Sequence, residues 1–219
     1  MRRAVICFTR VPRPGATKTR LLPVLSPKPC AALHTAFLKD LARVYRELDA
    51  ALFVAYAPDP DWALLKDIFP MASEFFPQTG ESLGERMDAA ICHVLSLGFE
   101  RVILTGTDLP AMGRERLESG FSALDLSDVV LGPTPDGGYY LVGAKAPCTA
   151  VFEEQQYGGG NVYENTVKAA ERAGLSLGQA LPCGDVDTPE DLRRLVLQAD
   201  PESHTGWFLA ALKKEGHLL

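Results

Sequence analysis

The stretch AVICFTRVPRPGATKTRLLPVLSPKPCAALHTAFLKDLARVYREL, residues 4–48, decides the fold class of this 219-residue chain. It opens with Ala4–Thr9, a short apolar run that is typical of a buried strand. A proline-rich loop follows, and it is too long for a simple turn. Ser26 and Pro27 then mark a helix start. Apolar side chains recur at helical spacing along one face of this helix, at Leu33, Phe37, Leu41, Val44 and Leu48. A strand, a long loop and an amphipathic helix in this order predict an α/β domain.

The rest of the chain continues the alternation of strands and helices. We expect further strands at residues 51–57, 73–76, 102–105, 128–132 and 139–142. We expect further helices at residues 62–69, 82–97 and 161–173, from residue 189 onward and around 207–212. Such an alternation predicts a three-layer α/β domain with a mostly parallel sheet, where ligands bind beyond the carboxyl ends of the strands. No repeat or linker divides the sequence, so we expect one domain over residues 1–219.

The composition excludes several classes of protein. With 47% hydrophobic and 23% charged residues, the chain is neither disordered nor collagen-like. Its longest apolar run, Ala50–Ala57, is far shorter than the roughly 20 residues of a membrane-spanning helix. The apolar segment after Arg2 and Arg3 is too short for a signal peptide, so we expect a cytoplasmic protein. The cysteines form no Cys-x-x-Cys pair, and we expect buried free thiols at Cys7, Cys30, Cys92, Cys148 and Cys183.

The charge is distributed unevenly along the chain. The net charge is −6, yet the first 39 residues hold eight basic residues and no acidic one. An acidic protein is a poor candidate for nucleic-acid binding, but a local basic loop can hold a small polyanion such as a triphosphate. The alternative is a solvated basic face.

The loop Pro14–Leu21, with the sequence PGATKTRL, carries part of this positive charge. It is not a Walker loop, and the chain has no Gly-x-Gly-x-x-Gly fingerprint. Gly15 lets the backbone approach an anion, while Lys18 and Arg20 offer a point charge and a bidentate fork to phosphate oxygens. The loop is therefore either a phosphate site or a basic surface loop.

Acidic residues also occur in two later loops of the predicted fold. Asp108 comes directly after the strand at 102–105, and Asp185 and Asp187 precede a helix that Thr188 can cap. Each acid has an ordinary explanation, as a turn residue or as a favourable charge at a helix start. Placed at one sheet edge with the basic loop, however, these acids would assemble a nucleotide–magnesium site.

Five motifs in fixed order carry a resemblance to a known family. They are KTRL at 18–21, LGERM at 83–87, TDLP at 107–110, DGGY at 136–139 and DVDTPEDL at 185–192. Together they resemble an uncharacterised bacterial family that is described as glycosyltransferase-like, of GT-A fold, and related to phospholactate guanylyltransferase. Gly15–Leu21 is also similar to the signature of molybdenum-cofactor nucleotidyltransferases. The resemblance covers about residues 3–195, leaves a helical tail at about 200–219, and implies a nucleotide-diphospho-sugar transferase fold with a mixed sheet.

The resemblance also implies a role for individual residues. Gly15, Lys18 and Arg20 would hold phosphates. The segment 78–86, with Gly80 and Arg86, would lie near the base and ribose. Asp108 and Asp187 would bind magnesium or manganese, and with Lys18 they would form the catalytic set. The acceptor would meet Asp136, Gly137, Gly138 and Tyr139.

One segment departs from the family pattern. Relatives often carry a Trp-Ser pair after the DGG turn, whereas this chain reads QYGGGN at 156–161. The resemblance therefore does not imply which acceptor this chain uses. We interpret Gly158–Gly160 as a flexible loop.

We therefore expect a transferase whose partners are a nucleotide and a small acceptor, with no membrane or nucleic acid involved. The KTRL loop would place the two cations Lys18 and Arg20 next to the tail of a bound triphosphate. This favours nucleotidyl transfer to a phosphorylated or hydroxyl acceptor. Glycosyl transfer from a nucleotide-sugar is the alternative, with Asp136 as its carboxylate. A second alternative is a non-catalytic nucleotide-binding module. The sequence specifies neither the base, the acceptor nor the oligomeric state.

Overall fold

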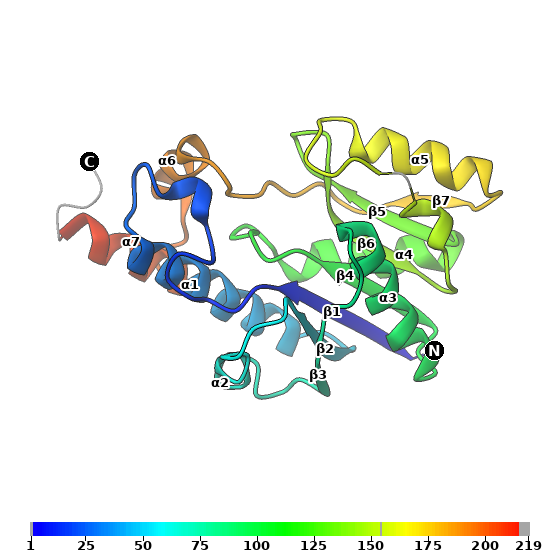
Figure 1. The fold of residues 1–219 in the computed structure, drawn as a ribbon, viewed down its shortest axis with the longest axis horizontal. Coiled ribbons are helices and arrows are strands. Elements are labelled where there is room, and N and C mark those ends of the chain that lie inside the picture. Colours follow the sequence, from blue (N-terminus) through cyan, green and yellow to red (C-terminus); the bar gives the residue numbers. More distant parts are fainter. Residues whose placement is uncertain (1, 154, 215–219) are drawn as a thin grey trace.

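The computed structural model describes residues 2–153 and 155–214, and it is built around one seven-stranded sheet. The strands lie in the order β3-β2-β1-β4-β6-β5-β7 (Figure 1). Their bounds are β1 (Arg3–Thr9), β2 (Ala51–Tyr56), β3 (Glu74–Pro77), β4 (Arg101–Thr105), β5 (Val129–Pro133), β6 (Tyr139–Ala144) and β7 (Leu177–Gln179). Neighbouring strands are parallel except where β6 pairs with β4 and β5. The predicted mixed, mostly parallel sheet is confirmed.

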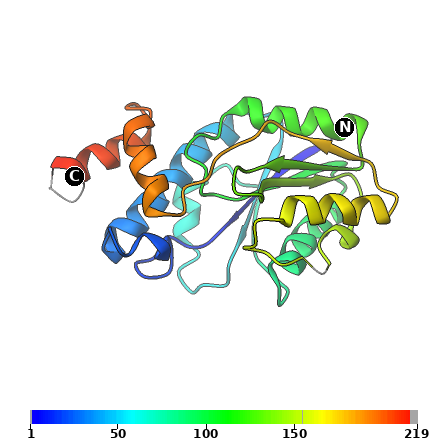
Figure 2. The ribbon, with the colours of Figure 1, turned by 90° about the horizontal axis from the view of Figure 1, so that it is seen from above.

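Helices cover both faces of the sheet and give the expected three layers (Figure 2). The helices are α1 (Pro27–Arg46), α2 (Leu64–Ile68), α3 (Leu83–Ser96), α4 (Arg114–Leu126), α5 (Val162–Arg172), α6 (Pro189–Gln198) and α7 (His204–Lys214). One core cluster packs α1, α2 and α4 against the sheet, and a second packs α3 and α5 against the other face. The central strand β1 is buried on both faces, which explains why Ala4–Cys7 is continuously apolar.

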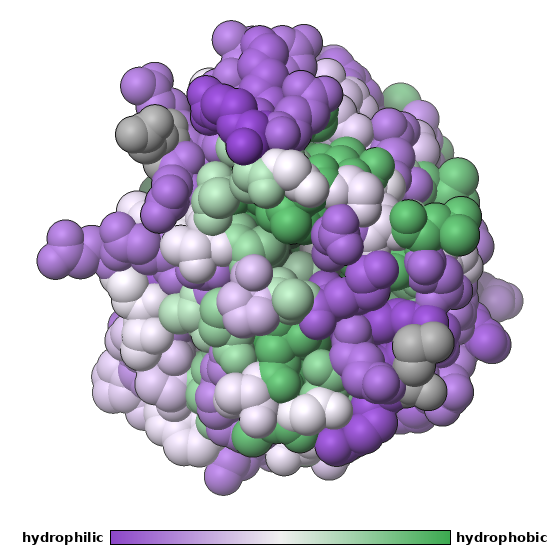
Figure 3. All heavy atoms as spheres, turned by 90° about the vertical axis from the view of Figure 1, so that its right-hand side faces the viewer, coloured by the Kyte–Doolittle hydropathy of each residue, from purple (hydrophilic) through white to green (hydrophobic). Residues whose placement is uncertain are grey.

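A third cluster of apolar side chains lies beside the sheet rather than on it. Helices α6 and α7 pack against the first half of α1, where Leu33 and Phe37 meet Leu192, Leu195 and Leu209. The pair stands at one end of the molecule, joined to β7 by an extended segment (Figures 1 and 2). On the opposite end, a central band of hydrophobic residues is flanked by hydrophilic ones (Figure 3).

Two elements were not expected from the sequence. Helix α4 follows Asp108, and the three-residue strand β7 adds a parallel edge to β5. The remaining elements lie within a few residues of their predicted places, and the helix expected at 62–69 is shorter. The extent of the core and tail stays a prediction. Helix α7 lies in the predicted tail, and residues 215–219 are outside the described residues.

Two expectations from composition are also tested by the model. All five cysteines are free, with four of them buried and Cys92 half-buried. Among the described residues, no helix has both the length and the apolar character needed to cross a membrane.

Candidate active site

The loop after β1 places a lysine beneath the carboxyl edge of the sheet. Lys18 has a left-handed backbone, with φ 52° and ψ 37°, and it is the one non-glycine residue with positive φ among those described. Gly15 supports the same loop at φ +80°. This backbone directs the Lys18 side chain inward, where it is 2% exposed and its Nζ lies 5.0 Å from the centroid of the Phe37 ring. The loop thus buries a positive charge.

The buried ammonium group brings the two predicted metal ligands together. Lys18 Nζ lies 2.6 Å from Asp108 Oδ1 and 3.7 Å from Asp187 Oδ1, and it donates a 2.5 Å hydrogen bond to the Val186 carbonyl. Arg20 reaches the other side of Asp187, with Nη1 3.1 Å from Oδ2. Asp108 follows β4 and Asp187 precedes α6, so segments distant in the sequence meet at this point.

Charges within this cluster alter the acidity of both aspartates. Burial alone would raise the pKa of Asp108, but the Lys18 ammonium, together with His34 and hydrogen bonds to the carboxylate, holds that pKa below its usual value. Burial and the negative charge of Asp108 raise the pKa of Asp187. The negative charge of the Asp187 carboxylate is therefore not fully balanced by Lys18 and Arg20.

The aspartates fit a hard divalent cation. Their side chains are 36% and 37% exposed, and both line a cavity. Carboxylate oxygens are preferred ligands of magnesium and manganese. The described residues include no group of three or more His, Cys, Asp or Glu side chains that could hold a metal. The remaining ligands would therefore be phosphate oxygens and water, as is usual for magnesium.

A cavity of about 780 Å³ opens beside this cluster, at the ends of β1 and β2. Its lining includes the expected Lys18, Arg20, Arg86, Asp108 and Asp187, together with Thr9, Arg10, His34 and Gln78. Gly15 and Gly80 shape the neighbouring turns but do not line it. Arg86 Nε donates a 2.9 Å hydrogen bond to the Gly80 carbonyl, which fixes the arginine at the cavity wall.

Gln78 occupies the buried end of this cavity. Its amide nitrogen donates to the carbonyls of Thr9 and Ala55, at 3.1 and 3.0 Å. The side-chain oxygen consequently remains as a hydrogen-bond acceptor. The family resemblance implies that this segment lies near the base, and this stays a prediction. The orientation of the amide depends on two carbonyl groups that only the fold brings close.

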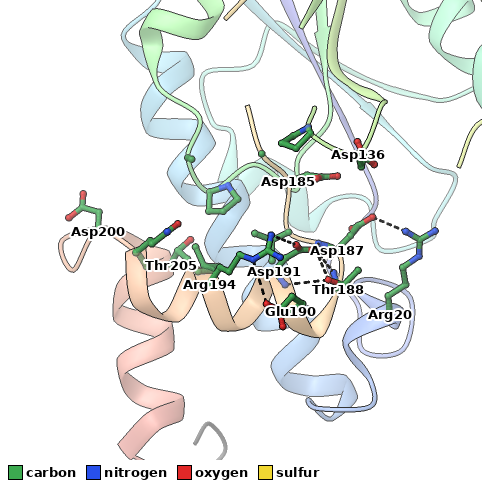
Figure 4. A pocket seen from close by; sticks show the side chains of 18 of the residues that line it. Arg20, Asp136, Asp185, Asp187, Thr188, Glu190, Asp191, Arg194, Asp200 and Thr205 are labelled. Carbon is green, nitrogen blue, oxygen red and sulfur yellow. Dashed lines mark hydrogen bonds and ion pairs between the residues drawn. The ribbon is translucent and has the colours of Figure 1, made fainter. Parts of the chain in front are cut away.

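A second cavity, of about 770 Å³, lies on the other side of Asp187 (Figure 4). It is enclosed by the turns at 110–111 and 135–136, the segment 184–188 and the helices α6 and α7. Arg20 and Asp187 line both cavities, so the cluster stands between them. Asp136 and Asp185 project toward the same open space in Figure 4.

The predicted acceptor residues are placed differently from one another. Asp136 lines the second cavity, and its Oδ1 accepts hydrogen bonds from Thr134 and from the Gly138 backbone. Gly137 and Gly138 form the turn itself. The Tyr139 hydroxyl lies 3.3 Å from that of Tyr157, and its ring packs against the second core cluster. The acceptor role of this segment stays a prediction.

The triple-glycine segment packs against that turn. A Cβ on Gly137 would lie 1.9 Å from the Gly160 carbonyl oxygen, so only glycine fits there without displacing the loop. Tyr163 also donates its backbone N–H to the Gly137 carbonyl, at 2.9 Å. In the described structure the segment therefore supports the acidic turn at Asp136.

Residues 40–159 match the model of a family described as "Uncharacterized protein conserved in bacteria (DUF2064)". The chain belongs to this family. The resemblance carried by the five motifs is thus confirmed.

Relatives of this DUF2064 chain include nucleotide-using transferases. It is 26% identical over 201 residues to 2-phospho-L-lactate guanylyltransferase from Methanothermobacter thermautotrophicus, covering 90% of this chain and 85% of the relative. A candidate nucleotide-diphospho-sugar transferase from Desulfovibrio desulfuricans G20 has a TM-score of 0.88 and 32% identity, covering 98% and 96% of the two chains. The 4-diphosphocytidyl-2C-methyl-D-erythritol synthase of Anaerococcus prevotii DSM 20548 shares the fold, with a TM-score of 0.53 at 14% identity over 88% and 96%. The expected nucleotide-diphospho-sugar transferase fold is confirmed.

Proposed function

We propose that this protein is a divalent-cation-dependent nucleotidyltransferase, which moves a nucleotidyl group from a nucleoside triphosphate to a hydroxyl group of a small, uncharged acceptor. The observation that carries the proposal is the cluster of Lys18, Asp108 and Asp187 between two cavities. The guanylyltransferase that is similar over 90% of the chain supports nucleotidyl transfer, and its own name states a phosphorylated acceptor.

Each side chain of the cluster has a part in the transfer. Asp108 and Asp187 would hold the cation, which when bound neutralises charge on the phosphate oxygens. Lys18 and Arg20 attract the two terminal phosphates, which leave as pyrophosphate. The acceptor oxygen forms a bond to the α-phosphorus while the bond from that phosphorus to the departing oxygen breaks. The hydroxyl proton passes to a carboxylate of the second cavity.

The charge of the second cavity favours an uncharged acceptor over a phosphorylated one. Six carboxylates line it: Asp136, Asp185, Asp187, Glu190, Asp191 and Asp200. Its two arginines are already paired, Arg20 with Asp187 and Arg194 with Glu190. Burial and the neighbouring Asp136 raise the pKa of Asp185, which receives no hydrogen bond or ion pair from another described side chain. Ionised carboxylates accept hydrogen bonds from hydroxyl groups and repel phosphates.

A thermal-shift panel tests the donor. The four nucleoside triphosphates and several nucleotide-sugars are each added with and without magnesium, because a bound ligand raises the melting temperature. We expect a magnesium-dependent shift with a triphosphate, and its loss in Asp108→Asn. A shift with nucleotide-sugars alone would instead support glycosyl transfer, and no shift with any nucleotide would contradict the proposal. A shift without product in the assay below would support a non-catalytic nucleotide-binding module.

Product formation tests the acceptor. The triphosphate that shifts the melting temperature is incubated with paired acceptors, each a polyol and its monophosphate, and pyrophosphate release is measured. We expect release with the polyols, and a loss of acceptor saturation in Asp185→Asn while nucleotide binding is unchanged. Faster release with the monophosphates would contradict the assignment of an uncharged acceptor.

A further inference from the structure

His34 places an unpaired nitrogen against the candidate metal ligand. It lies on α1, is 3% exposed and lines the first cavity. Its Nδ1 is buried without a hydrogen-bond partner among the described residues, and it lies 3.8 Å from Asp108 Oδ1. A buried polar atom without a partner costs free energy, so this nitrogen needs an explanation.

The hydrogen bonds of the other ring nitrogen assign the tautomer. His34 Nε2 lies 3.2 Å from the Arg10 carbonyl oxygen, which can only accept. It also lies 3.3 Å from Thr9 Oγ1, whose own hydrogen is directed to the same carbonyl, at 2.9 Å. Nε2 therefore carries the proton. A neutral imidazole whose proton is on Nε2 presents a lone pair at Nδ1.

The neighbouring lysine does not satisfy this lone pair. Lys18 Nζ donates to the Val186 carbonyl at 2.5 Å and lies 2.6 Å from Asp108 Oδ1 and 3.7 Å from Asp187 Oδ1. Asp108 is itself an acceptor when ionised. Two acceptors thus face each other across 3.8 Å, and a molecule with two hydrogens to donate can join them. Water has this property.

We propose that His34 is a positioning residue for the divalent cation, whose bound water donates a hydrogen bond to Nδ1 while Asp108 ligates the ion. This inference rests on the proposed function, which requires the cation. The imidazole, anchored to the Arg10 carbonyl, would orient that water and the Asp108 carboxylate. Such outer partners of a metal site typically contribute 10–100-fold to metal affinity.

Two substitutions separate the roles of the two ring nitrogens. The side-chain oxygen of His34→Asn is an acceptor close to the position of Nδ1. The amide of His34→Gln instead reaches the position of Nε2 and can still donate to the Arg10 carbonyl. A metal-positioning role requires the acceptor at Nδ1, whereas a purely structural role requires the donor at Nε2.

Manganese binding to the full chain is the test. Free Mn²⁺ is measured by electron paramagnetic resonance, with and without tripolyphosphate, for the wild type, both His34 variants and Asp108→Asn. We expect His34→Gln to weaken Mn²⁺ binding about tenfold or more and His34→Asn to stay within about threefold. Thermal unfolding of the same samples identifies any variant that fails to fold, and His93→Gln, at the partly exposed imidazole beside Glu74, is the matched control.

The outcomes separate this inference from the proposed function. If the wild type binds no Mn²⁺, or Asp108→Asn binds it equally well, the metal site fails and the inference with it. If Asp108→Asn abolishes Mn²⁺ binding but His34→Gln binds Mn²⁺ normally, only the inference is overturned. His34 Nδ1 would then accept a hydrogen bond from a water that does not belong to the metal site. Strong ¹⁴N coupling in pulsed spectra of bound Mn²⁺ would show direct ligation by His34 and would also overturn it.

Discussion

At the scale of the residue, Lys18 combines a strained backbone with a buried charge. A left-handed conformation costs a non-glycine residue roughly 1–2 kcal/mol, and a buried ammonium needs partners to offset its lost hydration. Here the partners are Asp108, Asp187 and the Val186 carbonyl. In the proposed function, Asp108 and Asp187 would hold the divalent cation, and the Lys18 ammonium would then contact the phosphates of the triphosphate.

Replacement of this lysine should therefore affect triphosphates selectively. In Lys18→Ala we expect triphosphate affinity to fall roughly 10–100-fold, because a charge-assisted hydrogen bond is worth about 1.5–3 kcal/mol. Monophosphate affinity should fall far less. Isothermal titration with both ligands measures this, with Lys28→Ala, an exposed lysine outside the cavity, as control. Equal losses for both ligands would exclude contact with the leaving phosphates.

The cysteines also behave as individual residues. Burial raises the pKa of both Cys7 and Cys148 to about 12. A raised pKa leaves almost no reactive thiolate at pH 8. We expect iodoacetamide to spare both thiols in the native protein and to modify them after unfolding in urea, as read by mass spectrometry. Rapid modification of native Cys7 would show that β1 opens to solvent.

Residue types predicted part of the site and geometry supplied the rest. Lys18, Arg20, Asp108 and Asp187 were identified because phosphate and metal chemistry requires such side chains after strands. The structure brings these four together. The sequence does not single out His34, because a position next to Leu33 on a buried helix face is typical of a core residue. Its role depends on a carbonyl that the folded loop brings to Nε2.

At the scale of the element, the start of α6 fixes the second aspartate. Thr188 Oγ1 accepts from the Asp191 backbone at 3.2 Å, and Asp191 Oδ2 accepts from the backbone N–H groups of Thr188 and Asp187, at 2.9 and 3.3 Å. This capping box holds the backbone on which the Asp187 carboxylate depends.

Loss of this cap should affect both stability and metal binding. We expect Thr188→Ala to lower the free energy of unfolding by about 1 kcal/mol and to weaken Mn²⁺ binding. Thr188→Ser keeps the hydroxyl and should behave as the wild type. Urea unfolding and the Mn²⁺ titration measure the two effects. Unchanged metal binding in a destabilised Thr188→Ala would mean that Asp187 is held from elsewhere.

Long elements were easier to predict than short ones. The buried strands show continuous apolar runs and α1 shows helical periodicity over 20 residues, whereas β7 has three residues and pairs with the edge of β5. The sequence analysis predicts no helix at α4, although Leu117, Phe121 and Leu124 have helical spacing. The capping residue Thr188 did predict a helix start, since a hydroxyl there satisfies a free amide.

At the scale of the whole molecule, α6 and α7 form a satellite on α1. Asp40 holds the start of α7, since its carboxylate accepts from the backbone of His204 and Thr205 at 2.8 and 2.9 Å and from the Thr205 hydroxyl at 2.6 Å. The packing of α6 and α7 on α1 was not predictable from local pattern, because it joins segments more than 160 residues apart.

Removal of this link should loosen the satellite selectively. In Asp40→Ala we expect faster amide hydrogen exchange over residues 189–214 and unchanged exchange in the sheet strands. The neighbouring exposed Lys39→Ala serves as control. Mass spectrometry of peptides after timed exchange resolves the two regions. Equal acceleration throughout the chain would show that satellite and sheet unfold as one unit.

The site draws one aspartate from the sheet and the other from the satellite, and this has a consequence for synthesis on the ribosome. Strands β1 to β4 and Asp108 emerge early, and they can begin to fold as the chain lengthens. Asp187 emerges much later. A nascent or truncated chain that ends after β7 would keep every strand of the sheet but lack the second carboxylate. The proposed two-aspartate site would thus be complete only after residue 187 has been translated.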